Sequence, residues 1–199
     1  MLNRALLIFL CVFALLLAGG CGNNESGSVS EDEIVIELVN QTDDITIAVA
    51  LFYGPNLDDW GEDLLGDETI EPGETVSFVL PRESYSIIPL TDQFFVLSPA
   101  RDISEDYRLQ IGEEGTVPVL VANNSQFDIA SFYFSPSDSD DWGEDWLGGE
   151  VVASGIGKYF FVEPGTYDIL ALGYDGDTLF RQDGKEITER TIIPFRDAD

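Results

Sequence analysis

Hydrophobic and polar residues alternate over short stretches along most of the chain. The segment 45–51 places large aliphatic residues on one side and small or polar residues on the other, and the segment 127–134 repeats this pattern. A period of two is typical of half-buried β-strands. Similar patterns predict strands at 75–80, 85–90, 94–97, 107–111, 158–162, 166–172, 178–181 and 191–195. Because turn residues separate these stretches and no long 3.6-residue apolar period follows residue 34, we expect an all-β fold.

One nine-residue motif occurs twice. The stretch 58–66 reads DDWGEDLLG and returns 82 positions later, at 140–148, as DDWGEDWLG, with eight of nine residues identical. With the same offset Gly73, Phe78 and Tyr85 match Gly155, Phe160 and Tyr167. Self-similarity of this kind indicates a duplicated structural unit. The sequence therefore predicts two tandem small antiparallel β-sandwich domains, at 34–112 and 116–195, joined by residues 113–115.

The N-terminal residues have the layout of a secretory signal peptide. Arg4 supplies one positive charge, 5–17 is an uncharged and mainly apolar run, and small residues lead to Cys21. The run 5–20 is shorter than the ~20 residues that a spanning helix needs. The segment resembles a bacterial lipoprotein signal, and this resemblance implies that Cys21 is lipidated and becomes the new N-terminus. We expect a signal peptide at 1–20 and a lipidated cysteine with a flexible, polar tether at 21–33.

Composition removes several partners and several kinds of chemistry. The chain has 38 Asp plus Glu and nine Lys plus Arg, and the leader contains Arg4 and no acid, so the mature chain carries 8 minus 38, or −30. Such a charge repels nucleic acid and anionic lipid, so the membrane partner is expected through the lipid anchor alone. The absence of histidine and of a free thiol in the mature chain excludes Ser-His-Asp and Cys-His catalysis and Cys/His zinc sites.

The duplicated motif has a structural interpretation. Asp59 with Glu62, and Asp141 with Glu144, have the spacing of a helical capping box, and two apolar residues and a glycine follow. This spacing predicts one helical turn from about residue 60 to residue 65, ended by Gly66 in the left-handed conformation. The structural residues of the motif would be Trp60, Gly61, Trp142 and Gly143, with the tryptophans closing one end of each sandwich.

A calcium site is the alternative interpretation of the same motif. Ca²⁺ takes clustered carboxylate and carbonyl oxygens and requires neither histidine nor cysteine. The candidate ligands are Asp58, Asp59, Glu62 and Asp63 in the first copy and Asp140, Asp141, Glu144 and Asp145 in the second. The match to a looped calcium motif ends at Trp60 and Trp142, which occupy a ligand position, and no glutamate occupies the twelfth position.

Aromatic residues suggest a different binding surface. Phe52, Phe132 and Phe134 fall on the strand face opposite the aliphatic residues, so they are candidates for a platform that binds a glycan or a partner protein. The alternative is that both faces of these strands are covered. A carboxylate hydrolase that uses motif acids remains a remote possibility, although acids duplicated in tandem are better explained as structure.

The motif, the preceding Asn, the Pro-Gly turn and the following Tyr and Asp-Gly are similar to those of uncharacterised bacterial envelope proteins with tandem copies of this unit. The similarity covers 34–195 and implies no activity. From all these features we expect a membrane-anchored envelope lipoprotein, facing the periplasm or the exterior, with a non-catalytic structural or protein-interaction role. The alternative is a calcium-dependent or aromatic-platform module that binds envelope glycans.

Overall fold

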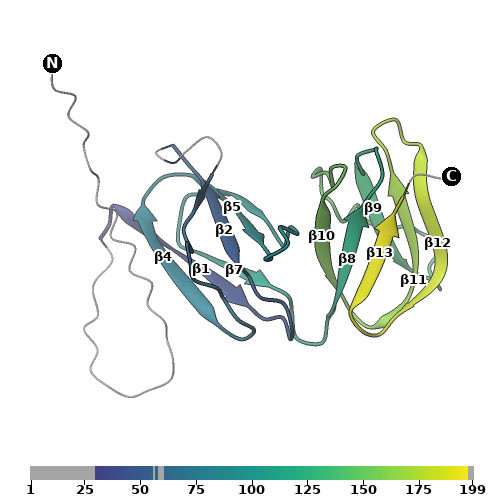
Figure 1. Cartoon of the computed structure of the whole chain (residues 1–199), viewed down its shortest axis with the longest axis horizontal. Coiled ribbons are helices and arrows are strands. Elements are labelled where there is room, and N and C mark those ends of the chain that lie inside the picture. The colour runs from purple at the N-terminus through teal and green to yellow at the C-terminus, as the bar shows by residue number, and fades with distance from the viewer. Residues whose placement is uncertain (1–29, 56, 58–60, 197–199) are drawn as a thin grey trace.

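The fold consists of β-strands, turns and bends. The computed structural model describes residues 30–55, 57 and 61–196, and these residues contain no helix (Figure 1). The strands are β1 (Glu33–Asn40), β2 (Val49–Tyr53), β3 (Glu62–Asp63), β4 (Thr75–Pro81), β5 (Tyr85–Leu90), β6 (Ala100–Ile103), β7 (Tyr107–Ile111), β8 (Val117–Asn123), β9 (Ser131–Pro136), β10 (Gly157–Val162), β11 (Gly165–Leu172), β12 (Thr178–Ile187) and β13 (Thr191–Phe195). The all-β fold predicted from the alternating pattern is confirmed.

Strands β1–β7 form one sandwich, called here the N-terminal sandwich. Its two sheets have the orders β4-β1-β7 and β3-β2-β5-β6. Alternate residues of both sheets point inward, so Ile36, Phe78, Phe52 and Ile87 are almost fully buried in one shared core. Phe52 and Phe78 face each other from opposite sheets with ring centroids 4.8 Å apart. This interdigitation of two inner faces is what holds a β-sandwich together.

Strands β8–β13 form the C-terminal sandwich, with sheets β10-β8-β13 and β12-β11-β9. Its core is richer in aromatic side chains than the first. Phe132 of β9 stacks on Phe160 of β10 with centroids 5.2 Å apart, and Phe134 and Phe195 pack edge-on against Phe132 at 4.8 and 5.9 Å. Pairs of this geometry contribute beyond the area that they bury. The prediction of two β-sandwiches in tandem is therefore confirmed.

Each sandwich contains one parallel pair that the sequence did not predict. β1 pairs with β7, and β8 pairs with β13 in the same manner. The last strand of each unit thus returns beside the first strand, so each sandwich is mixed rather than purely antiparallel. Because the paired strands run in the same direction, the start of β1 and the end of β7 lie at opposite ends of the unit, and β7 ends at the short connection to β8. The bounds 34–112 and 116–195 stay a prediction, since they concern folding of each unit alone.

A buried asparagine near the end of the first strand is used identically in both copies. Nδ2 of Asn40 donates to the carbonyl oxygens of Ile45 and Ile70, at 2.7 and 2.8 Å, while its Oδ1 accepts from the backbone and side chain of Thr42. The counterpart Asn123 makes the matching bonds. A buried polar group is stable only when it is hydrogen-bonded. The duplicated unit is therefore preserved in its interior contacts as well as in its surface motif.

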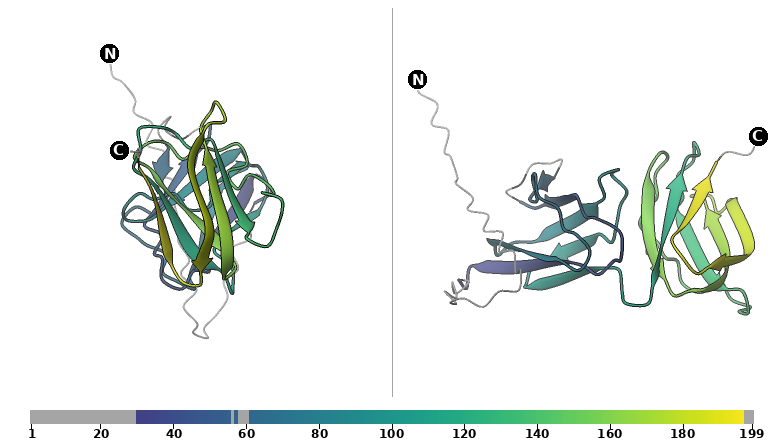
Figure 2. Two further views of the ribbon diagram at one scale, coloured as in Figure 1. Left: turned by 90° about the vertical axis from the view of Figure 1, so that its right-hand side faces the viewer. Right: turned by 60° about the horizontal axis from the view of Figure 1, so that its bottom comes forward.

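The two sandwiches lie end to end in an elongated molecule (Figures 1 and 2). β1 begins at the end that is remote from the C-terminal sandwich, and β12 forms the opposite side of the molecule. The connection between β7 and β8 lies at one side of the joint. Any attachment through the N-terminal residues therefore lies at the far end from the C-terminal sandwich.

The joint is built from main-chain hydrogen bonds as well as side chains. Val96, in the loop between β5 and β6, donates to the carbonyl oxygen of Gly157 at 2.8 Å, and its own carbonyl accepts from the amide of Tyr159 at 2.8 Å. Tyr159 and Leu120 of the C-terminal sandwich are buried in the core of the N-terminal one. The predicted strand at 94–97 is thus a loop that pairs with the other sandwich.

Candidate functional site: the motif turns and the groove at the joint

The last acid of the second motif copy is bound to backbone amides. Oδ1 of Asp145 accepts hydrogen bonds from the amides of Phe132 and Leu147, at 2.9 and 3.0 Å. The amide of Trp146 donates to the carbonyl oxygen of Phe132 at 2.8 Å. An aspartate that accepts from the amide two residues ahead forms a stable local turn. Asp145 therefore fastens the motif to the first part of strand β9.

The first copy makes the same contacts. Oδ1 of Asp63 accepts from the amides of Ala50 and Leu65, at 3.0 and 3.1 Å, and the amide of Leu64 donates to the carbonyl oxygen of Ala50. All of these residues precede their counterparts in the second copy by 82 positions. Asp58, Asp59 and Trp60 lie outside the described residues. Within its described part, the motif thus has in both copies a carboxylate that holds a turn against a strand.

The predicted helical turn is wrong for the described part of the motif. Residues 141–148 form bends and turns, and Asp141 accepts from the amide of Gly143 at 3.2 Å instead of capping a helix with Glu144. The left-handed conformation of Gly66 is confirmed by its φ of 62°. Gly61 and Gly143 are also left-handed, with φ of 81° and 73°, which explains why both copies have glycine there. The segment forms tight turns instead of a helix, because the side chains of Asp141 and Asp145 accept hydrogen bonds from the amides two residues ahead.

Trp142 does not close the sandwich, which corrects the second structural expectation. It is half-buried on the outer side of the β9 sheet, where its ring lies 6.5 Å from that of Tyr133 and the guanidinium of Arg181 lies 5.4 Å above it. The residue that plugs the core is Leu147, which is 3% exposed, and Leu65 has the same role in the first copy. The two leucines lie two positions after the amide-bound aspartates, so the turn positions them.

The motif acids of the second copy do not form the calcium site that their spacing suggested. Asp145 is turned toward backbone amides, and Asp140 and Glu144 are exposed. Within 30–55, 57 and 61–196 no group of three or more acidic side chains is placed to hold a metal ion. In the first copy Glu62 is exposed and Asp63 binds amides, while the other two candidate ligands lie outside the described residues.

A small hollow of about 140 Å³ lies beside the second motif copy. Asp168 lines it and accepts from the Ser137 hydroxyl at 2.6 Å and from the Gly184 amide at 2.8 Å. These two hydrogen bonds lower the pKa of Asp168 below its usual value. Arg181 also lines the hollow and is hydrogen-bonded to Asp183. The charges of Asp168 and Arg181 are therefore already satisfied within the fold.

The aromatic platform predicted from the sequence is wrong. Phe52 and Phe132 are 0% exposed and Phe134 is 3% exposed, so all three belong to the cores. Both faces of these strands carry large residues, and alternation alone does not tell which face the opposing sheet covers. The inner sheet faces are lined by these phenylalanines, while Leu51 and Tyr133 lie on the outer side.

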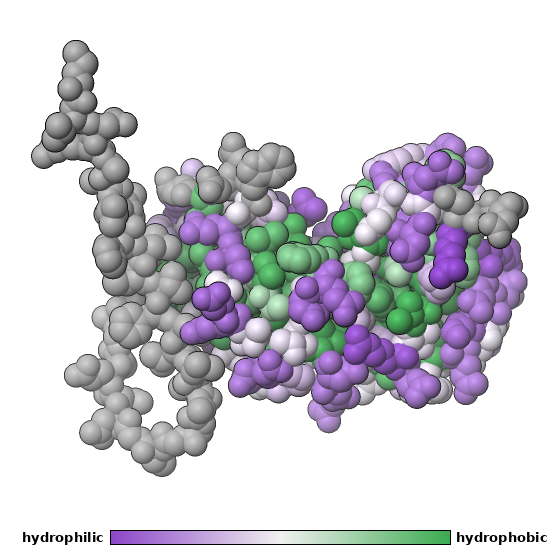
Figure 3. All heavy atoms as spheres, in the orientation of Figure 1, coloured by the Kyte–Doolittle hydropathy of each residue, from purple (hydrophilic) through white to green (hydrophobic). Residues whose placement is uncertain are grey.

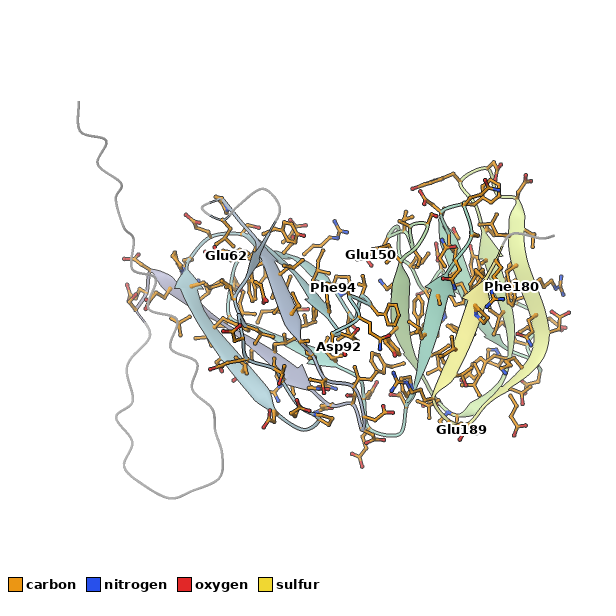
Figure 4. The ribbon with its side chains drawn as sticks, viewed as in Figure 1. Glu62, Asp92, Phe94, Glu150, Phe180 and Glu189 are labelled. Carbon is orange, nitrogen blue, oxygen red and sulfur yellow. The ribbon has the colours of Figure 1, made fainter. Side chains whose placement is uncertain are left out.

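A groove follows the joint between the two sandwiches. A concavity of about 410 Å³ is lined by Gln110 and Glu113 on one side and by Trp146, Glu150 and Lys158 on the other. A second, of about 470 Å³, adjoins it along the 112–116 connection. Figure 3 shows a notch in the outline where the two sandwiches meet, and Figure 4 places Glu150 on the side of its sandwich that faces the other one.

The groove residues were missed in the sequence because their roles depend on the second sandwich. Lys158 is 8% exposed and is paired with Glu150, which also lies 3.6 Å from Arg101 of the N-terminal sandwich. The available signal was a departure from the repeat: Lys158 stands where the first copy has Val76, and Trp146 stands where it has Leu64. Such departures mark surfaces that only one copy possesses.

The expected signal peptide and Cys21 lie outside the described residues. Across the described part of the chain, no helix is long and apolar enough to cross a membrane. The described residues of the expected tether are limited to 30–33, and Arg82 ties them down by donating to the carbonyl oxygens of Glu31 and Glu33, at 2.9 and 3.0 Å. Lipid anchoring thus rests on the sequence alone.

The fold and its contacts define a tandem β-sandwich protein. No protein-family model and no curated protein matches the sequence. Among solved structures, the chain is similar to the TIE protein of Bacillus anthracis (12% identity, TM-score 0.26), with 82% of this chain aligned to 33% of that one. It is also similar to CBMbc, a family CBM26 module of Eubacterium rectale Amy13K solved with maltoheptaose (13%, 0.29; 82% of this chain, 91% of that one).

A third similar structure is the shaft pilin SpaA of Lactobacillus rhamnosus GG, at 12% identity and a TM-score of 0.26, covering 84% of this chain and 98% of that one. The chain spans about a third of the length of the TIE protein. All these TM-scores are below 0.5.

Proposed function

We propose that this protein is a lipid-anchored, non-catalytic structural or protein-interaction module of the bacterial cell envelope. The observation that carries the proposal is the identical use of Asp63 and Asp145. Each carboxylate accepts from two backbone amides at the same place in its sandwich. A carboxylate that holds a turn in this way is committed to the fold, because freeing it would leave amides unsatisfied. The most distinctive feature of the sequence is therefore explained by architecture rather than by reaction chemistry.

The arrangement of the two sandwiches supports a role in which shape matters. The described chain begins at one end of an elongated molecule, and the C-terminal sandwich lies at the other (Figure 1). Main-chain hydrogen bonds at Val96 restrict movement at the joint. An anchor at Cys21 would then hold the N-terminal sandwich near the membrane and present the C-terminal sandwich outward. The charge of −30 would keep the body away from anionic headgroups.

The anchor is tested by metabolic labelling of the full chain in a bacterial host with an alkyne-tagged palmitate. We expect label on the wild type, partition into the detergent phase, and loss of both in Cys21→Ser. Cys11→Ser is the matched control, because Cys11 lies inside the expected leader and should leave labelling unchanged. An unlabelled wild-type chain that stays in the aqueous phase would contradict the anchor.

The non-catalytic part needs its own test. The purified chain is incubated with a panel of envelope polysaccharides and the reducing ends are counted. We expect no turnover above the buffer control. Turnover that disappears in Glu62→Gln or Glu144→Gln would overturn the proposal, since these two exposed motif acids do not hold the turns.

A further inference from the structure

The groove at the joint is a continuous trough rather than a closed pocket. Its two concavities, of about 410 and 470 Å³, share Gly112, Glu113, Thr116 and Phe161. They therefore follow the connection between the sandwiches from one part of the joint to the next. A trough of this form holds the middle of an extended, chain-like ligand, whereas a compact ligand needs walls on most sides.

Trp146 presents a fixed aromatic surface to this trough. It is 41% exposed, although its ring packs edge-on against Phe134 and Phe160 with centroids 5.3 and 6.2 Å away. Packing against two buried rings restricts the indole before any ligand arrives, so little side-chain entropy is lost on binding. The first copy has Leu64 at the equivalent position, so only the second copy of the motif has a tryptophan there.

The charges around the trough favour a neutral ligand. Lys158 is the one cation among the described residues that line the two concavities, and it is held by Glu150. No lining amine or guanidinium in this described part is thus left to bind a phosphate or carboxylate. Glu113 and Glu114 and the overall charge of −29 add repulsion toward anions.

The polar lining consists of groups that bond hydroxyls. Ser98 and Gln110 contribute hydroxyl and amide groups and Glu113 contributes carboxylate oxygens, while the Thr116 hydroxyl is hydrogen-bonded to the main chain of Glu113. Gln110 donates to the carbonyl oxygen of Gly112 at 3.2 Å, which fixes it beside the connection. An exposed indole beside hydroxyl and amide groups suits a ligand with apolar C–H faces and hydroxyl edges.

We propose that this trough binds a neutral linear oligosaccharide, with one sugar ring packed on Trp146 and neighbouring hydroxyls bonded by Gln110 and Glu113. The proposal rests on the envelope role proposed above for its setting, since polysaccharides are polymers of that compartment. It does not depend on the buried phenylalanines. The site spans both sandwiches, so neither unit contains it alone.

Calorimetric titration of the full chain, purified in detergent, tests the proposal. The probes are linear hexasaccharides of β-1,4-glucose, α-1,4-glucose and β-1,4-N-acetylglucosamine. We expect saturable binding of at least one, and a rise in Kd of at least about tenfold in Trp146→Ala. Trp142→Ala is the matched control, because this tryptophan of the same motif copy lies on Arg181 outside the trough. It should change Kd less than about twofold.

Gln110→Ala provides a second variant in case Trp146→Ala loses its fold. Gln110 is exposed on an edge strand, so its truncation leaves the cores intact, and we expect a weaker Kd at an unchanged melting temperature. Absence of binding by all three probes at about 10 mM would overturn the proposal. So would binding that is unchanged in both variants. Neither result touches the palmitate test, which reads the anchor independently of the trough.

Discussion

At the scale of single residues, the motif works through one carboxylate oxygen per copy. Oδ1 of Asp145 satisfies two amides, and the next but one residue, Leu147, enters the core. Leu147 would not reach the core without the turn, and the amide of Phe132 would lack a partner. The two-residue spacing, present in both copies, thus couples the hydrogen bonds of the aspartate to the burial of the leucine.

Asp145→Ala should lower the free energy of unfolding by about 2–3 kcal/mol, because it removes two charge-assisted hydrogen bonds and leaves their donors unsatisfied. Chemical denaturation of the full chain measures it. Glu144→Ala is the control, since Glu144 is an exposed neighbour in the same turn, and it should change stability by less than about 0.5 kcal/mol. Equal effects of the two substitutions would contradict the assignment.

Leu147 and Trp142 should differ in the same assay. Leu147→Ala removes a buried side chain, which costs about 2–5 kcal/mol in comparable cores. Trp142→Ala removes a half-buried ring and its contact with Arg181, worth about 0.5–1 kcal/mol at an exposed site. A larger loss of stability for Trp142→Ala than for Leu147→Ala would return the tryptophan to the role of plug that its sequence suggested.

Asp168 makes part of the stability depend on pH. Hydrogen bonds from Ser137 and Gly184 lower its pKa in the folded state. The carboxylate therefore stabilises the fold above its unfolded pKa of about 3.9, and this contribution is lost as the pH falls through the folded pKa. Asp168→Asn should melt at a lower temperature than wild type at pH 7, and the gap should narrow toward pH 2. A gap independent of pH would contradict this.

The residues also show what sequence reasoning can reach. Alternation predicted β4, β5, β7 and β13 nearly to their ends, because each packs one face on a core of its own unit. Alternation misplaced Phe132 because the covered face of a strand is set by the opposing sheet. Trp146 and Lys158 were missed because their roles depend on the other sandwich. Contacts within a unit leave a period in the sequence, whereas contacts between units do not.

At the scale of elements, the loop between β5 and β6 makes the main-chain contacts that hold the two sandwiches together at the joint. It carries Phe94, whose φ of 60° is unusual for a bulky residue, next to Phe95 and Val96. Figure 4 shows Phe94 and Asp92 on the side of the N-terminal sandwich that faces the other one. Val96 pairs with β10 through two main-chain hydrogen bonds, and the rings of Phe95 and Tyr159 lie 6.3 Å apart. These contacts of Phe95 and Val96 with the C-terminal sandwich hold the strained turn in place.

Gly157→Val should open this joint. A Cβ at Gly157 would lie 2.5 Å from Cδ1 of Phe95, so the ring of Phe95 must move, and we expect the loop to withdraw with it and the Val96 pairing to be lost. We expect small-angle scattering to show a larger radius of gyration and a broader distance distribution than for wild type. Ile156→Val, at the exposed neighbouring position, is the control and should scatter as wild type does. An unchanged radius for Gly157→Val would show that the joint does not depend on this close approach.

At the scale of the whole molecule, the two copies differ in the face that meets a neighbour. On the outer side of the β10-β8-β13 sheet, Tyr159 lies beside Leu120, and both are buried against the N-terminal sandwich. The matching row of the first copy is Ser77, Glu37 and Arg108, with Arg108 donating to Glu37 at 2.6 Å. The C-terminal sandwich thus meets its neighbour with an apolar face, whereas the matching face of the N-terminal sandwich is polar.

Because Tyr159 and Leu120 of the C-terminal sandwich pack in the core of the N-terminal one, we expect the two sandwiches to unfold together. Differential scanning calorimetry of the full wild-type chain tests this claim most directly. We predict one transition whose van't Hoff enthalpy equals the calorimetric enthalpy. Two separate transitions, or a van't Hoff enthalpy near half the calorimetric value, would contradict the view that the motif turns and the Val96 joint build one cooperative unit.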